Sequence, residues 1–159
     1  MKVEKMVRKI SFIGVGPGDP DLLTIKAMKE IKSAEVIFWA DSLIPEKIIN
    51  FANNHSEKIR TSSLDLNQIM QKMIKRYKEG KKVIRLHDGD PCLFGAITEQ
   101  IEILKKENIT IEVIPGISAF QVTASYHQAE LTIPDITQQL YFQELEGEQG
   151  CQKESLSRI

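Results

Sequence analysis

Three loops rich in glycine, proline and aspartate hold the residues of this chain best suited to binding a ligand. They are residues 14–20 (GVGPGDP), 88–91 (DGDP) and 115–118 (PGIS). Glycine lets a ligand approach the backbone closely, and proline stiffens the loop around it. One such loop alone is more often only a turn between a strand and a helix. Because three loops share this character and each follows an apolar run, together they predict a binding site.

The first loop differs from a dinucleotide-binding motif in its spacing. Its glycines follow the pattern G-x-G-x-G, and Asp19 stands where G-x-G-x-x-G requires the third glycine. The carboxylates of Asp19 and Asp21 would repel the pyrophosphate that the N-terminus of a helix attracts. The acidic rim therefore favours a ligand without phosphate groups, preferably one that carries positive charge.

The positions of histidine and cysteine predict neither a metal site nor a disulfide. The three histidines are dispersed, and Cys92 and Cys151 are far apart with no C-x-x-C pair. Cys92 has no nucleophile signature around it, and we interpret it as a spacer. His87 could accept a proton near neutral pH, although a histidine at the end of a strand is more often packed in the core.

Short apolar runs alternate with amphipathic stretches, which predicts an α/β fold with a mostly parallel sheet flanked by helices. We expect strands at residues 10–15, 35–40, 58–62, 82–87 and 109–114, and a further strand at 137–145. We expect a helix capped by Asp21, and helices at residues 45–52, 65–79, 94–107 and 117–127. Parallel strands end at one edge of the sheet, so the three loops should meet there.

Composition narrows the class of partner. The 159 residues include 21 basic and 22 acidic side chains, and the net charge of -1 argues against a nucleic-acid-binding surface. No apolar run approaches the ~20 residues of a membrane span, and the charged N-terminus does not resemble a secretory signal. We therefore expect a cytoplasmic protein with a small-molecule substrate and neither nucleic acid nor membrane as partner.

The chain resembles the tetrapyrrole (corrin/porphyrin) methylase family from about residue 10 to residue 156. The resemblance is carried, in the family's order, by GVGPGDPDLLTIKA, RLHDGDPCLFGAI, EVIPGISAF and LTIPDITQ. The segment WADSLIP, the letters GAI after RLHDGDP, and LTIPDITQ are similar to the branch of the family that acts on precorrin-4 or cobalt-precorrin-4.

The resemblance implies methyl transfer from S-adenosyl-L-methionine to C11 of precorrin-4 or cobalt-precorrin-4 in cobalamin biosynthesis, without a metal cofactor. It implies a homodimer for the full-length form. It also implies a set of cofactor-binding residues: Pro17, Asp88, Gly89, Asp90, Leu93, Phe94, Ser118 and Ala119. For Asp90 and Ser118, capping of the following helix competes with a role in binding. Asp41 and Ser42 are implied to bind substrate. Arg85 and His87 are candidates to face the tetrapyrrole and to act in catalysis, with no catalytic residue assigned.

The resemblance also predicts how the chain is divided. Residues 1–9 would be an N-terminal extension, 10–135 the N-terminal α/β methylase domain, and 136–159 a linker with the truncated start of a C-terminal domain. Family members bind the cofactor between two domains, so we expect this chain alone to bind it weakly or not at all. The alternatives are another tetrapyrrole methylase, acting on uroporphyrinogen III or a different precorrin, and a non-catalytic truncated binding domain.

Overall fold

A five-stranded parallel sheet forms the centre of the computed structural model, which describes residues 8–143. The strands are β1 (Lys9–Gly14), β2 (Val36–Trp39), β3 (Glu57–Arg60), β4 (Val83–His87) and β5 (Thr110–Ile114), in the order β3-β2-β4-β1-β5. The α-helices are α1 (Ile25–Ser33), α2 (Glu46–Ile49), α3 (Leu66–Lys78), α4 (Ile97–Lys106) and α5 (Ala119–Tyr126), and a 3₁₀ turn spans Pro20–Leu22. The predicted α/β class and the five strands at residues 10–114 are confirmed.

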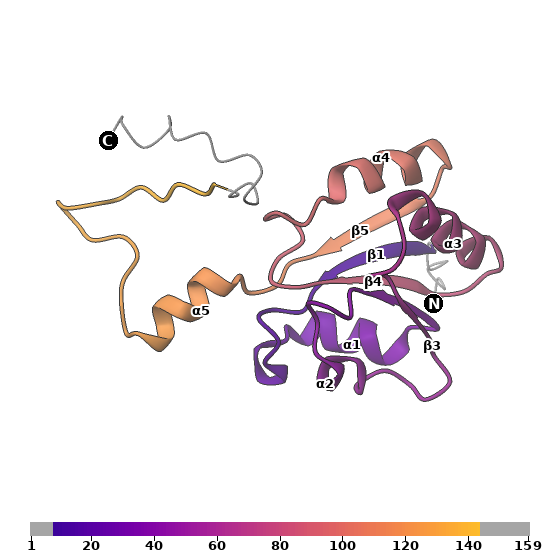
Figure 1. The fold of residues 1–159 in the computed structure, drawn as a ribbon, viewed down its shortest axis with the longest axis horizontal. Coiled ribbons are helices and arrows are strands. Elements are labelled where there is room, and N and C mark those ends of the chain that lie inside the picture. The colour runs from indigo at the N-terminus through magenta and orange to yellow at the C-terminus, as the bar shows by residue number, and fades with distance from the viewer. Residues whose placement is uncertain (1–7, 144–159) are drawn as a thin grey trace, which may run out of the picture.

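Helices cover both faces of the sheet, with α1 and α2 on one side and α3 and α4 on the other (Figure 1). All four residues of β2 are buried, as a strand covered on both faces requires. Alternate residues of β1, β2, β4 and β5 enter two separate clusters. In β4, Ile84 and Leu86 pack toward α1 and α2, whereas Val83 packs toward α3 and α4.

The first α-helix begins later than expected, and Asp21 does not cap it. Asp19 instead accepts a hydrogen bond from the Asp21 N–H at 3.0 Å and caps the 3₁₀ turn. Thr24 then caps α1 by accepting from the Ala27 N–H at 3.1 Å. Pro20 directs this break, because it is suited to the first position of a short helical turn.

The helix expected from residue 94 begins only at Ile97. Phe94 and Ala96 have positive φ angles of 56° and 47°, which no residue inside an α-helix adopts. The segment from Pro91 to Ala96 is therefore a loop that extends the second of the three glycine-rich loops. This loop contributes several residues to the cavity described below.

Helix α5 and the segment after it lie beyond the ends of the strands, away from both helical layers (Figure 1). No residue of α5 is buried. The strand expected at 137–145 is not formed within the described residues 137–143, where an isolated pair joins only Ile133 and Thr137. Residues 144 and 145 lie outside the described part. A strand needs a neighbour to pair with, and this segment runs beside none.

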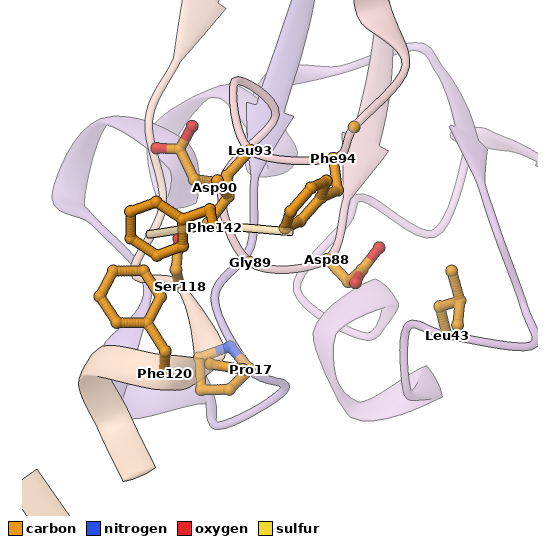
Figure 2. A pocket seen from close by; sticks show the side chains of 12 residues that line it. Pro17, Leu43, Asp88, Gly89, Asp90, Leu93, Phe94, Ser118, Phe120 and Phe142 are labelled. Atoms are coloured by element: carbon orange, nitrogen blue, oxygen red, sulfur yellow. The ribbon is translucent and has the colours of Figure 1, made fainter. Parts of the chain in front are cut away.

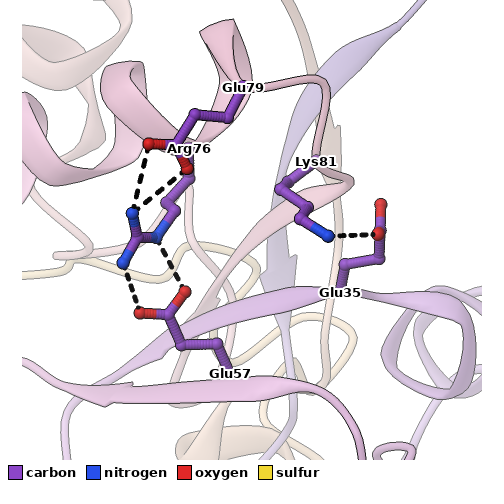
Figure 3. A network of polar contacts seen from close by, with 5 residues as sticks. All are labelled: Glu35, Glu57, Arg76, Glu79 and Lys81. Carbon is purple, nitrogen blue, oxygen red and sulfur yellow. Dashed lines mark hydrogen bonds and ion pairs between the residues drawn. The ribbon is translucent and has the colours of Figure 1, made fainter.

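An ion pair joins the edge strand β3 to helix α3 (Figure 3). Arg76 on α3 donates to both carboxylate oxygens of Glu57 on β3, from Nε and Nη2, each at 2.7 Å. A second contact joins Arg76 Nη1 to Glu79 at 3.1 Å. The Arg76 guanidinium lowers the pKa of the Glu57 carboxyl, and the paired geometry makes this a specific contact.

No helix in the described part of the chain is both long and apolar enough to cross a membrane.

Candidate functional site

The first two glycine-rich loops pair with each other through their backbones. The Gly16 N–H donates to the Gly89 carbonyl at 3.2 Å, and the Gly89 N–H donates to the Gly16 carbonyl at 2.9 Å. Next to this pair, the Val15 N–H donates to the His87 carbonyl at 2.9 Å. The adjacent position of β1 and β4 in the sheet thus continues into their loops, as the common strand edge predicted.

The third loop packs against the other two where only glycine fits. A Cβ added to Gly116 would lie 2.1 Å from the Gly89 carbonyl oxygen and 2.7 Å from the Gly14 carbonyl carbon. A Cβ added to Gly14 would lie 2.5 Å from the Gly116 nitrogen. These neighbours are backbone atoms, which cannot move aside as a flexible side chain can. The glycines at these two positions therefore serve contact between loops.

Asp90 links the second loop to the third. Its Oδ1 accepts a hydrogen bond from the Cys92 N–H at 2.7 Å, and its Oδ2 accepts one from the Gly116 N–H at 3.1 Å. Helix α4 begins seven positions later at Ile97, so the expected alternative of helix capping by Asp90 is wrong. Ser118, by contrast, is the N-cap residue of α5, and the Gln121 side chain accepts from its N–H at 3.1 Å.

A cavity of about 430 Å³ opens where the three loops meet, and Figure 2 shows its lining. Its size is typical of a site for a small molecule. Every residue predicted to bind the cofactor lines it, namely Pro17, Asp88, Gly89, Asp90, Leu93, Phe94, Ser118 and Ala119. Their role in binding a cofactor stays a prediction.

Four further residues line the cavity that the sequence did not single out: Leu43, Gly95, Phe120 and Phe142. Phe120 directly follows the predicted pair Ser118 and Ala119, so continuing that stretch by one residue would have found it. Leu43 follows the predicted substrate pair in the same way. No local pattern marks Phe142, because it reaches the cavity from a segment without regular structure.

The walls of the cavity are aromatic and its free charge is negative. The rings of Phe120 and Phe142 lie 4.9 Å apart between centroids, and Phe94 is 53% exposed at the cavity's edge. The Asp88 carboxylate points away from that of Asp90 (Figure 2). Asp88 is exposed, and its carboxylate makes no hydrogen bond or ion pair within the described residues. The lining contains no lysine, arginine or histidine, so it favours a flat, neutral or cationic ligand over a phosphate.

The two predicted substrate-binding residues lie beside the cavity and do not line it. Asp41 accepts a hydrogen bond from the Ser62 hydroxyl at 2.6 Å, and this contact lowers the pKa of the Asp41 carboxyl. Ser42 is exposed, and Leu43, which follows it, lines the cavity. The turn that holds all three therefore borders the cavity on the side of β2.

The two catalytic candidates do not reach the cavity, because the alternation of β4 directs them to the face covered by α3 and α4. His87 is 8% exposed and lies against Phe12, with 5.8 Å between ring centroids. Burial, with the charge of Arg85, lowers the pKa of His87 to about 4. Burial also lowers the pKa of Arg85 to about 10, so its guanidinium remains charged at neutral pH. Within the described residues, neither Arg85 Nη1 nor His87 Nε2 has a hydrogen-bond partner.

Across residues 8–143, no group of three or more His, Cys, Asp or Glu side chains is placed to hold a metal ion. Cys92 is a free, exposed thiol.

Comparison with known proteins gives consistent results. The family model of the Tetrapyrrole (Corrin/Porphyrin) Methylases matches residues 9–158. A cobalt-precorrin-4 C(11)-methyltransferase of Priestia megaterium is 42% identical over 139 residues, which are 87% of this chain and 54% of the relative. The chain thus spans about half the length of this curated relative.

Solved structures show the same fold. The X-ray structure of a cobalamin biosynthetic enzyme, cobalt precorrin-4 methyltransferase, superposes with a TM-score of 0.86 at 40% identity, covering 91% of this chain and 61% of that one. A uroporphyrin-III C-methyl transferase from Thermus thermophilus, complexed with S-adenyl homocysteine, gives 0.66 at 30% identity and covers 80% of this chain and 51% of that one. With the family model matching nearly the whole sequence, the chain belongs to the tetrapyrrole (corrin/porphyrin) methylases.

Proposed function

We propose that this chain supplies the first domain of an S-adenosylmethionine-dependent enzyme that methylates precorrin-4 or cobalt-precorrin-4 at C11 in cobalamin biosynthesis. The observation that carries the proposal is the cavity, which gathers all eight residues that the family resemblance assigns to the cofactor. The cobalt-precorrin-4 methyltransferase matches are 40–42% identical over 87–91% of this chain, against 30% over 80% for the solved uroporphyrin-III enzyme, and this favours the C11 reaction. In this proposal residues 10–135 are the methylase domain, residues 136–159 lead into a second domain, and the enzyme is a cytoplasmic homodimer.

The cavity has the properties that S-adenosylmethionine requires. The aromatic side chains Phe94, Phe120 and Phe142 offer faces for a flat purine ring, and the free carboxylate of Asp88 favours a cation. The lining has no cationic side chain that would repel a sulfonium. The Thermus thermophilus enzyme was solved with S-adenyl homocysteine, which differs from the proposed cofactor by the transferred methyl group.

When bound, S-adenosylmethionine supplies a methyl group on a positively charged sulfur, ready for in-line transfer to a carbon nucleophile. The chain's contribution to such a transfer is to align the two reactants and to keep water out. The backbone contacts of Gly16, Gly89 and Gly116 hold the three loops around the cavity together before any ligand arrives. The buried positions of Arg85 and His87 give no support for a proton transfer by either residue at the cavity.

The test compares the chain with a chimera in which the C-terminal half of the Priestia megaterium relative is joined to it. We expect the chain alone to bind S-adenosylmethionine weakly or not at all in calorimetric titration, because one wall of the cofactor site is proposed to come from the second domain. We expect the chimera to bind it and to methylate cobalt-precorrin-4. Micromolar binding by the chain alone would contradict the first expectation.

Two results would overturn the proposed reaction. Methylation of uroporphyrinogen III without methylation of cobalt-precorrin-4 by the chimera would assign the chain to another tetrapyrrole methylase. A folded chimera that binds no S-adenosylmethionine would point to a domain without catalytic function. A variant of the chimera with Asp88→Asn tests the role of the negative charge in the cavity. It should keep its fold, and its affinity for the cationic cofactor should fall below that of the unchanged chimera.

A further inference from the structure

We propose that Asp90 is a positioning residue that holds two walls of the cavity at a set distance, and that its carboxylate does not bind the ligand. This inference rests on the proposed function only where it concerns the ligand. The loop after β4 carries Asp88, Gly89, Leu93 and Phe94 on one wall, and the loop after β5 leads to Ser118 on the other. Asp90 is the side chain that joins the two loops.

Both oxygens of the Asp90 carboxylate are already engaged. Oδ1 accepts from the Cys92 N–H at 2.7 Å within its own loop, and Oδ2 accepts from the Gly116 N–H at 3.1 Å across to the next loop. Hydrogen bonds to an ionised acceptor are about twice as strong as those between neutral groups. The carboxylate therefore fixes the shape of its own loop with one oxygen and the spacing to its neighbour with the other.

At Gly116 the two loops are in such close contact that even a small change would alter the spacing between them. The Gly116 Cα lies against the Gly14 backbone and the Gly89 carbonyl, so closely that no Cβ fits. Without Asp90 the half-buried Gly116 N–H would have no partner in the loop, and an unpaired buried N–H is costly. The hydrogen bond across the loops and the glycine contact therefore act together to keep the third loop against the second.

Asp88 provides the contrast within the same loop. Its carboxylate is exposed at the cavity, points away from that of Asp90 (Figure 2), and makes no hydrogen bond among the described residues. The two aspartates of the DGD sequence thus have different roles, because Asp88 presents a free charge to the cavity and Asp90 holds the loops together. The same substitution at both positions separates these roles.

The test uses Asp90→Asn and Asp88→Asn in the 159-residue chain, followed by NMR. Asparagine matches aspartate in shape but has only one acceptor oxygen, so Asp90→Asn places an NH₂ group against one of two N–H donors. We expect amide exchange of Gly116 or Cys92 to rise about tenfold or more in Asp90→Asn, as loss of a charge-assisted hydrogen bond implies. In Asp88→Asn the exchange of both amides should stay at the wild-type rate.

Ligand titration of the same two variants in the chimera separates a positioning role of Asp90 from direct contact between its carboxylate and the cation. S-adenosylmethionine carries a positive sulfur, whereas the sulfur of S-adenosylhomocysteine is neutral. A positioning residue affects the binding of both ligands alike, so Asp90→Asn should lower the affinity for both by the same factor. Asp88→Asn should lower the affinity for S-adenosylmethionine more than that for S-adenosylhomocysteine, because it removes a charge that faces the cavity.

Three outcomes would count against the proposal. The first is wild-type amide exchange at Gly116 and Cys92 in Asp90→Asn. The second is a selective loss of affinity for S-adenosylmethionine in that variant, which would show that the Asp90 carboxylate contacts the cation directly. The third is the absence, in the wild-type chain, of a scalar coupling through the hydrogen bond between the Gly116 nitrogen and the Asp90 carboxyl carbon.

The third measurement needs no variant and no ligand, so it decides the matter even if Asp90→Asn fails to fold. A wild-type chimera that binds neither ligand bears on the proposed function alone, and Asp90 is then judged by the coupling and the amide exchange.

Discussion

His87 is buried against Phe12, and burial makes its imidazolium costly to form. A histidine is suited by its chemistry to proton transfer, and an arginine such as Arg85 is suited to binding a carboxylate. The alternation of β4 instead turns both side chains to the face of the sheet covered by α3 and α4. At this strand end the position in the pleat, more than the residue type, decides what a polar group can do.

The burial of His87 makes the stability of the chain depend on pH. Its pKa is 6.5 in the unfolded chain and about 4 in the fold, so between these values the unfolded chain binds the proton more tightly. Stability is therefore present above pH 6.5 and is lost as the pH falls toward 4. Between pH 7 and pH 5 this loss is about 2 kcal/mol, and His87→Gln should remove it, as measured by urea unfolding at the two pH values.

The matched control is His127→Gln, because His127 is exposed at the end of α5. This variant should show the same difference in unfolding free energy between the two pH values as the wild-type chain. An equal difference in His87→Gln and wild type would contradict the prediction.

Gly116 is the residue at which a single methyl group should do most harm to the site. Its φ is not in the left-handed region, so alanine at this position has no penalty from its φ angle. The cost is steric, because the added Cβ would lie 2.1 Å from the Gly89 carbonyl oxygen. We expect Gly116→Ala to destabilise the chain by about 1–3 kcal/mol through overpacking, and to separate the loops. Urea unfolding measures the first effect and titration of the chimera with S-adenosylhomocysteine the second.

A control for Gly116→Ala is Gly80→Ala, which changes a glycine with a φ of +88° near the flexible Arg8 side chain. It should cost stability through its dihedral angle and leave ligand affinity unchanged, since Gly80 does not line the cavity. Equal losses of affinity in both variants would show that general destabilisation, not loop packing, reduces binding.

At the scale of elements, the loop before α4 is held in an unfavourable backbone conformation. Phe94 and Ala96 both have positive φ angles, and Gly95 between them approaches Pro91 so closely that a Cβ would lie 2.2 Å from its carbonyl oxygen. This folding of the loop places Phe94 at the edge of the cavity. Strain of this kind gathers at functional sites, where the surrounding structure maintains it.

Relief of that strain can be measured at Ala96, which is exposed and has no side chain beyond Cβ. Ala96→Gly should stabilise the chain by about 1 kcal/mol, because glycine adopts a positive φ without penalty. The same substitution inside α5, Ala124→Gly, should instead destabilise by up to about 1 kcal/mol. Changes of the same sign in the two variants, measured by urea unfolding, would contradict the role of the dihedral angle at Ala96.

At the scale of the whole molecule, apolar side chains stay exposed on α5 and the segment after it. Tyr126 is 84% exposed, Ile136 79% and Tyr141 87%. Helix α5 and the segment after it, which carry these residues, lie beyond the strand ends (Figure 1). Large exposed apolar surfaces are typical of regions that pack against another protein surface. The helical layers on the sheet, in contrast, already bury their apolar faces.

This surface predicts that the chain associates with itself as its concentration rises. Replacing both Ile136 and Tyr141 with serine should lower the average mass found by sedimentation toward that of the monomer. The urea midpoint should stay unchanged, because neither residue belongs to the core. Replacing the exposed Gln138 with serine is the control, and an equal effect of that change would argue against an apolar origin.

The sequence by itself determined the class of fold and the five strands, and its resemblance to the family pointed to eight residues that line the cavity. The strands and loops are local properties: apolar runs mark strands, and the glycine, proline and aspartate that follow them mark loops at one edge of a parallel sheet. The ends of elements were less certain. Asp19 and Thr24, not Asp21, cap the turn and helix after β1, because several nearby side chains offered the same hydrogen bond.

Only the tertiary structure decided how these local parts are used. It set the strand order β3-β2-β4-β1-β5, turned Arg85 and His87 away from the cavity, and brought Phe142 into it. It also joined Asp90 to the N–H of Gly116, 26 residues further along the chain. Such contacts depend on which strands become neighbours, and neighbouring strands are chosen by packing over the whole sheet, not by the residues beside each loop.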